Sequence, residues 1–212
     1  MARFTQGING PFHGKVGTVI GATWKGIPYM RARPKKRSSG PTEREMANRK
    51  KWALSQFWLQ PICEFVQIGW KGYSQKSEGF VAAKSYLLKN AFEGEGQDVH
   101  INPALVKVSA GDLPLPASMQ INRLEDRLVQ FTWDTAFDHE KAHKGDQVML
   151  LAYNIEKVKA NYNLIGQLRK NGSDVLELPA NKSGTYHLYA AFISYDRIRQ
   201  SDSIYLGTVE VG

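Results

Sequence analysis

Cysteine is almost absent from this chain of 212 residues, which contains only Cys63. A single cysteine excludes an internal disulfide framework and any metal site built from several cysteines. Cys63 lies in the apolar run 62–66, where a free cysteine is ordinarily a small buried hydrophobic residue. No activating base is evident near it, so we do not expect a catalytic thiol.

Long hydrophobic runs are also missing. No stretch approaches the roughly 18 consecutive apolar residues that a membrane-spanning helix needs. The start, Met-Ala-Arg-Phe-Thr-Gln-Gly, lacks the apolar segment of a secretory signal. We therefore expect no membrane partner and, by default, a cytoplasmic protein. A place in a phage-like or extracellular assembly stays open, because structural proteins of such particles also lack signals.

Acidic residues are scarce in the first quarter of the chain. Residues 1–51 contain twelve basic side chains and only two acidic ones, Glu43 and Glu45, which gives a net charge of +10. The whole chain carries +8, so the remaining residues carry −2. This asymmetry predicts that the N-terminal part binds a polyanion or an acidic protein surface.

The N-terminal sequence predicts an arm followed by a β-hairpin. Residues 1–14 contain three glycines and one proline, which favours an extended arm. Alternation over 16–22, a turn at Lys25-Gly26 and a return strand over 27–33 predict the hairpin. Pro28 cannot donate a backbone hydrogen bond, so the return strand should lie at a sheet edge.

A helical segment is predicted next. Thr42 and Glu45 have the spacing of a capping box, and apolar pairs then recur at helical intervals. Pro61 should end this helix and open a second one. A third helix is predicted from about residue 77 to residue 90, before a glycine-rich linker over 93–98.

From Ala104 onward the sequence period becomes two. Seven or eight short runs alternate or are rich in β-formers, and turn signals such as Asn171-Gly172 separate several of them. This pattern predicts an immunoglobulin/fibronectin-III-like antiparallel β-sandwich with Trp133 between its sheets. The expected fold class is α+β, with a basic Gly-rich arm and β-hairpin over 1–41, a short helical segment over 42–98 and the sandwich over 99–212.

Parts of the sequence resemble a known family. The run from Gly14 to Arg31, GKVGTVIGATWKGIPYMR, with the Pro-Lys-Lys-Arg cluster that follows it, is similar to the N-terminal signature of an uncharacterised Bacteroidota family of unknown function. Residues 186–192 and 201–207 are similar to the same pattern. The resemblance spans essentially the whole chain. It implies an architecture and a host phylum, and it carries over no catalytic or binding residue.

The string His139-Glu-Lys-Ala-His143 matches the zincin pattern, in which two histidines one helical turn apart bind zinc and the glutamate activates water. It lies between two predicted strands that leave room for at most about nine helical residues, a marginal length for an unsupported helix. No third ligand is evident. A polar loop is the preferred interpretation, and we expect no catalytic residue, no metal and no cofactor. A zinc hydrolase remains a distant alternative.

The predicted functional surface combines the aromatic ring of Tyr29, on which a base can stack, with cations that can neutralise phosphates. This basic stripe consists of Tyr29, Arg31, Arg33, Lys35, Lys36 and Arg37. The sequence favours a non-enzymatic architectural protein that forms a homo-oligomer or filament through its arm, with DNA or another polyanion as a second partner. The alternative is a soluble immunoglobulin-like recognition module whose sandwich loops bind a carbohydrate or a protein.

Overall fold

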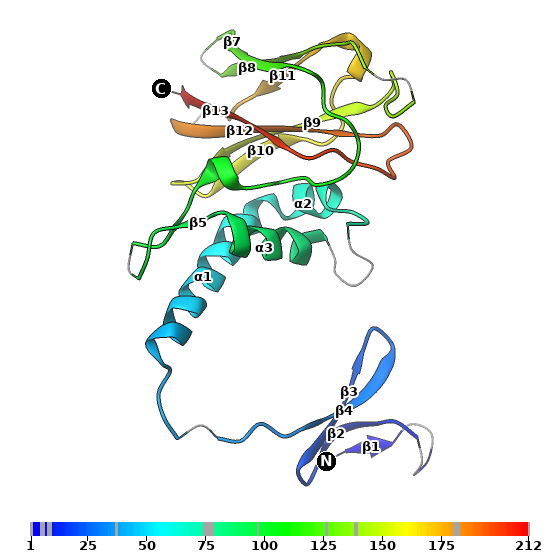
Figure 1. Ribbon diagram of the computed structural model, residues 1–212, viewed down its shortest axis with the longest axis vertical. Helices are drawn as coiled ribbons and strands as arrows, with labels where there is room; N and C mark the ends of the chain where they lie inside the picture. The colour runs from blue at the N-terminus through cyan, green and yellow to red at the C-terminus, as the bar shows by residue number, and fades with distance from the viewer. Residues whose placement is uncertain are drawn as a thin grey trace. The chain divides into compact units, whose positions relative to one another are not determined.

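The computed structural model describes residues 2–4, 7, 10–36, 38–73, 79–96, 98–125, 127–137, 140–179 and 183–211. The chain forms two compact units, residues 1–42 and residues 43–212 (Figure 1). We call them the N-terminal unit and the body and describe each by itself. Helices and antiparallel sheets occupy separate stretches of the chain, so the fold class is α+β. Among the described helices, none combines the length and the hydropathy of a membrane span.

The N-terminal unit is a four-stranded antiparallel sheet in the order β1-β2-β3-β4. Its strands are β1 (Arg3–Phe4), β2 (Phe12–Val16), β3 (Val19–Trp24) and β4 (Ile27–Ala32). The predicted hairpin joins β3 to β4, and both Lys25 and Gly26 have the positive φ that a two-residue type I′ turn requires. β4 lies at the end of the sheet, as Pro28 predicted.

The prediction of an extended arm before this hairpin was wrong. β2 pairs with β3 and β1 pairs with β2, so the chain is folded back on itself well before the hairpin. The cause is a second two-residue loop at Gly17-Thr18, in which Gly17 has a φ of 54°. The sequence hid this loop because Val16 and Val19, which pair across it, both continue a strand-like alternation.

The body begins with an uninterrupted helical run of 27 residues. Helices α1 (Glu43–Leu59) and α2 (Cys63–Gly69) are joined by one 3-10 turn, η1 (Gln60–Ile62). As Pro61 predicted, the first α-helix ends just before it and a second one follows. The helical run nevertheless continues between them, because a 3-10 turn accommodates a residue without an amide and the Cys63 amide closes that turn on the Gln60 carbonyl. A further helix, α3 (Gly79–Asn90), packs against both α1 and α2.

Short elements lead from the helices to the sheets. β5 (Phe92–Glu93) pairs with β6 (His100–Ile101), and a 3-10 turn, η2 (Pro103–Leu105), follows. The Asn102 side chain accepts a hydrogen bond from the Ala104 amide at 3.0 Å, which caps this turn.

Seven strands build two antiparallel sheets. One has the order β10-β9-β12-β13 and the other β11-β8-β7. The strands are β7 (Met119–Arg123), β8 (Leu128–Trp133), β9 (Gln147–Asn154), β10 (Lys159–Asn163), β11 (Ser173–Glu177), β12 (Gly184–Ile193) and β13 (Ile204–Val211). A 3-10 turn, η3 (Arg169–Asn171), precedes β11.

The two sheets share a buried core. Phe131 and Trp133 from β8 pack with Leu150 from β9 and Phe192 from β12. The rings of Trp133 and Phe192 meet edge to face at 5.5 Å, a favoured aromatic geometry. The structure therefore confirms the prediction that Trp133 is a core residue between sheets.

The helices cover the other face of the β10-β9-β12-β13 sheet (Figure 1). Trp58 of α1 packs edge to face on Tyr153 of β9 at 4.9 Å, and the Tyr153 hydroxyl donates to the Trp58 carbonyl at 3.0 Å. Burial raises the pKa of Tyr153 to about 12. Because both faces of this sheet are covered, β9 is buried from Val148 to Asn154 instead of alternating with polar residues.

Candidate functional site

Two places in the molecule have the character of binding surfaces. One is the N-terminal sheet, which carries the predicted basic stripe. The other is a cleft in the body that the sequence did not reveal.

The N-terminal sheet has almost no interior of its own. Among the described residues of this unit, only Gly21 is buried. Trp24 pairs with Ile27 and Ala22 with Tyr29, so alternation places them on one face of the sheet. We call this the aromatic face, and it consists of Ile20, Ala22, Trp24, Ile27, Tyr29 and Arg31.

Large apolar side chains are exposed on this face and on the opposite one. Trp24 is 55% exposed and Ile27 is 63% exposed on the aromatic face, while Met30 on the other face is 70% exposed. A sheet normally buries its apolar side chains against a second layer. Within the N-terminal unit, Phe12 lies against Gly21 on the opposite face, but Trp24, Ile27 and Met30 stay more than half exposed.

Among the described strands, β4 pairs only with β3, so its other backbone edge is available for pairing. The Arg33 amide donates to the Thr18 carbonyl at 2.7 Å, towards β3. Inward and outward amides alternate along an antiparallel strand, so those of Met30 and Ala32 point away from β3. Pro28 occupies an outward position as well, where a missing amide costs no hydrogen bond within the sheet.

The described members of the basic stripe are all exposed. Tyr29 and Arg31 lie on β4 and share the aromatic face, while Arg33, Lys35 and Lys36 follow the strand. Arg37 lies outside the described residues. The structure thus brings the ring of Tyr29 and the guanidinium of Arg31 onto one surface and leaves the other cations on the segment that follows.

All of the chain's net charge belongs to the N-terminal unit. Residues 1–42 contain eight basic and no acidic side chains. Residues 43–212 contain twenty of each, so the body is neutral and the unit carries the full +8. This is a strong local positive potential for so small a sheet.

The zincin-like string does not form a helix over its described part. His139 lies outside the described residues, and residues 140–143 are in turn and coil. The Nδ1 atom of His143 accepts a hydrogen bond from the Gly145 amide at 3.1 Å, and its ring lies 4.6 Å from that of Tyr195. Across the described stretches, no group of three or more His, Cys, Asp or Glu residues has the arrangement of a metal site.

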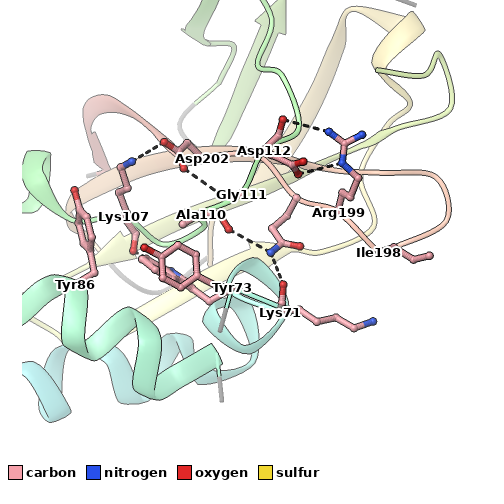
Figure 2. A pocket seen from close by; sticks show the side chains of 13 residues that line it. Lys71, Tyr73, Tyr86, Lys107, Ala110, Gly111, Asp112, Ile198, Arg199 and Asp202 are labelled. Atoms are coloured by element: carbon pink, nitrogen blue, oxygen red, sulfur yellow. Dashed lines mark hydrogen bonds and ion pairs between the residues drawn. The ribbon is translucent and has the colours of Figure 1, made fainter. Parts of the chain in front are cut away.

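The second surface is a cleft of about 620 Å³ where the helices meet one end of the sheets (Figure 2). Three parts of the chain line it: residues 70–73 after α2 together with Tyr86 of α3, the chain before β7, and the β12–β13 connection. Trp70 forms its buried floor, with Tyr73 at a ring distance of 4.7 Å and Tyr86 at 5.6 Å.

Buried polar groups tie these three segments together. The Ser109 hydroxyl contacts the Gly69 carbonyl at 3.0 Å and the Ser201 carbonyl at 2.7 Å. The Gln200 side-chain amide donates to the carbonyls of Ala110, at 3.2 Å, and Lys71. Because Ser109 and Gln200 are buried, these bonds fix the cleft's walls.

Two ion pairs form the polar walls of the cleft (Figure 2). Lys107 Nζ lies 2.5 Å from Asp202 Oδ2, and Arg199 Nε lies 3.0 Å from Asp112 Oδ1. The hydrogen bond to Asp202 raises the pKa of Lys107, and the hydrogen bond from Arg199 lowers the pKa of Asp112. Both shifts favour the charged form of the residue concerned.

The sequence contains the segments that line this cleft, but it does not show that they lie together. Gly69-Trp-Lys-Gly-Tyr73 and Tyr195-Asp-Arg-Ile-Arg199 are short runs that combine aromatic and charged residues. Gly111-Asp112 is a turn signal of the kind that separates two strands. Loops that carry aromatic and charged residues are frequent binding segments, but only the fold shows that these three come together.

The protein is thus an α+β protein with a basic, poorly buried N-terminal sheet and a neutral body in which helices cover one of two packed sheets. It belongs to a family of unknown function, DUF6266, whose model matches residues 11–207. No curated protein and no solved structure matches the chain. The family match assigns no binding or catalytic residue.

Proposed function

We propose that this chain is a non-enzymatic architectural protein that assembles with other copies of itself through its N-terminal sheet. We further propose that the basic stripe binds DNA or another polyanion. The sheet that forms the assembly surface is larger than the hairpin expected from the sequence, and it begins at β1.

The observation that carries this proposal is the poor burial of the N-terminal unit. Only Gly21 is buried among its described residues, while Trp24, Ile27 and Met30 are more than half exposed. Folding a chain costs about 1–2 kcal/mol of backbone entropy per residue. A single exposed sheet buries little apolar surface, so burial offsets only a small part of that cost. Contact with a second copy would bury these side chains and stabilise the sheet.

The free edge of β4 supports strand pairing as one mode of contact. The amides and carbonyls of Met30 and Ala32 point outward and can form hydrogen bonds with a further strand. Such edges are usually blocked in monomeric proteins. Here Pro28 blocks one outward position, at the start of the strand, and leaves the rest available.

The charge of the unit links assembly to a polyanion. Two N-terminal units that each carry +8 repel one another. Phosphates that neutralise Arg31, Arg33, Lys35 and Lys36 would reduce this repulsion. We therefore propose that a polyanion favours assembly instead of competing with it.

We propose that the seven body strands form an immunoglobulin/fibronectin-III-like sandwich. In chain order, the first, second and fifth strands, β7, β8 and β11, form one sheet, and the third, fourth, sixth and seventh form the other. This is the constant-type immunoglobulin arrangement with the fourth strand moved beside the third. In the proposed architecture the body acts as the spacing domain.

Replacing apolar side chains on the aromatic face tests the assembly proposal. We expect Trp24→Ser combined with Ile27→Ser to convert oligomers into monomers, because both side chains are exposed and neighbouring. The matched control is Tyr195→Ser with Ile198→Ser, an aromatic and an isoleucine that are similarly exposed on the body. Multi-angle light scattering measures the particle mass of both variants. Loss of oligomers only in the Trp24 and Ile27 variant supports the proposal, and equal masses in both variants contradict it.

A further inference from the structure

We propose that the cleft floored by Trp70 is a binding site for an uncharged carbohydrate. The site lies entirely within the body, so this proposal is independent of assembly through the N-terminal sheet.

The aromatic side chains of the cleft suit a pyranose ring. Tyr73 is 59% exposed beside the buried Trp70, and the ring of Tyr86 of α3 lies 5.6 Å from that of Trp70. The C–H bonds on a sugar face carry partial positive charge and match the negative face of an aromatic ring. A flat, exposed ring on a rigid floor is therefore a suitable stacking surface for a sugar.

The charged groups of the polar walls are two ion pairs and one lysine that is bound to a backbone carbonyl. Lys107 is paired with Asp202 and Arg199 with Asp112, while Lys71 Nζ donates to the Arg197 carbonyl at 3.3 Å. An anionic ligand would have to compete with the carboxylate of Asp202 for Lys107, or with that of Asp112 for Arg199. A neutral polyol can use the remaining donor and acceptor positions of both pairs without breaking them.

The cleft is also preorganised and large enough. Its volume of about 620 Å³ falls within the roughly 300–1,000 Å³ typical of small-molecule sites. The Ser109 and Gln200 hydrogen bonds hold the three segments in place, so little ordering of the walls is needed when a ligand binds. Ile198, which is 68% exposed, adds an apolar contact at the rim.

Isothermal titration calorimetry with defined sugars tests the proposal on the full chain. The probes are neutral hexasaccharides of α-1,4-glucose, β-1,4-glucose, β-1,4-mannose and β-1,4-xylose, with a sulfated glucose hexasaccharide as the anionic comparison. We expect at least one neutral probe to bind with one site per chain and to bind more tightly than the sulfated probe. Failure of every neutral probe at about 5 mM, near the weak limit of specific affinity, overturns the proposal.

Variants then assign the binding to the cleft. We expect Tyr73→Ala and Asp112→Ala each to weaken the affinity about tenfold, which corresponds to about 1.4 kcal/mol. Tyr73→Phe should keep most of the affinity, because the ring remains. Tyr195 is about as exposed as Tyr73 but lies outside the cleft lining. The Tyr195→Ala variant should therefore bind the sugar as tightly as the unaltered chain does.

The substituted residues are exposed, so the variants should stay folded, which thermal melting checks. Affinity that is unchanged in both Tyr73→Ala and Asp112→Ala, or lost equally in Tyr195→Ala, contradicts the assignment.

Discussion

At the scale of single residues, the body places a full ion pair in its interior. Arg169 and Asp146 are almost completely buried, with Arg169 Nε 3.3 Å from Asp146 Oδ2. The guanidinium lies 4.4 Å from the ring of Phe192 and donates to the Pro114 carbonyl at 2.7 Å. Asp146 also accepts from the His143 and Tyr195 amides, so one carboxylate joins η3 to two loops.

Replacing Asp146 with asparagine should therefore destabilise the body strongly. Asp146→Asn keeps the size of the side chain but leaves the Arg169 charge buried without a counter-charge, which costs about 3–5 kcal/mol. The exposed Asp98→Asn is the matched control and should change the free energy of unfolding by less than about 0.5 kcal/mol. Chemical denaturation measures both, and equal stabilities would contradict the structural role given to the pair.

Binding of a polyanion by the basic stripe should depend strongly on salt concentration. If about five phosphates of duplex DNA are neutralised, log affinity should fall with log salt at a slope of roughly −4 to −5. Changing Arg31 and Arg33 together to alanine should weaken binding similarly on all sequences and make the slope shallower by about two. Fluorescence anisotropy with random-sequence DNA at several salt concentrations measures this.

The matched control for the stripe removes two exposed cations from the body, Lys159→Ala with Lys170→Ala. It should leave the slope unchanged. No binding at low salt, or a slope that the Arg31 and Arg33 changes do not alter, would leave the stripe as a surface that docks on another subunit.

At the scale of elements, the sequence predicted the hairpin turn at Lys25-Gly26 but not the one at Gly17-Thr18. Lys25-Gly26 interrupts the apolar alternation and is visible as a turn, whereas Gly17 lies inside a run that still alternates. The sequence also predicted that the first helix ends at Pro61 and that a second one follows. It did not predict that a 3-10 turn joins the two, which the full burial of Ile62 and Phe65 favours.

The edge of β4 gives an element-scale prediction. Ala32→Pro removes one outward amide with little change in side-chain size, and proline is tolerated at a sheet edge. If copies pair through this edge, the variant should assemble at a several-fold higher protein concentration than Ala32→Ser, which keeps the amide. Sedimentation velocity over a concentration series measures the difference, and identical profiles would exclude pairing through β4.

At the scale of the whole molecule, the positions of the charged residues along the chain predicted the charge asymmetry, and the change from helical to strand periodicity predicted the α+β class. The sequence could not predict that helices cover the outer face of the β10-β9-β12-β13 sheet, because a strand such as β9 that is buried on both faces looks like any short apolar run. It could not predict the cleft either. Tyr73, Asp112 and Arg199 are brought together only by the packing of α2, the chain before β7 and the β12–β13 connection.

Mass measurement of two purified chains, before and after nuclease treatment, tests the central claim most directly. The full chain should form particles heavier than its 23.8 kDa monomer, and they should become smaller when nuclease removes a bound polyanion. A chain lacking residues 1–40 should keep a cooperative melting transition, because the body has its own core, and it should be monomeric with or without nuclease. A full chain that is monomeric throughout, or a truncated chain that forms the same particles, would contradict assembly through the N-terminal sheet.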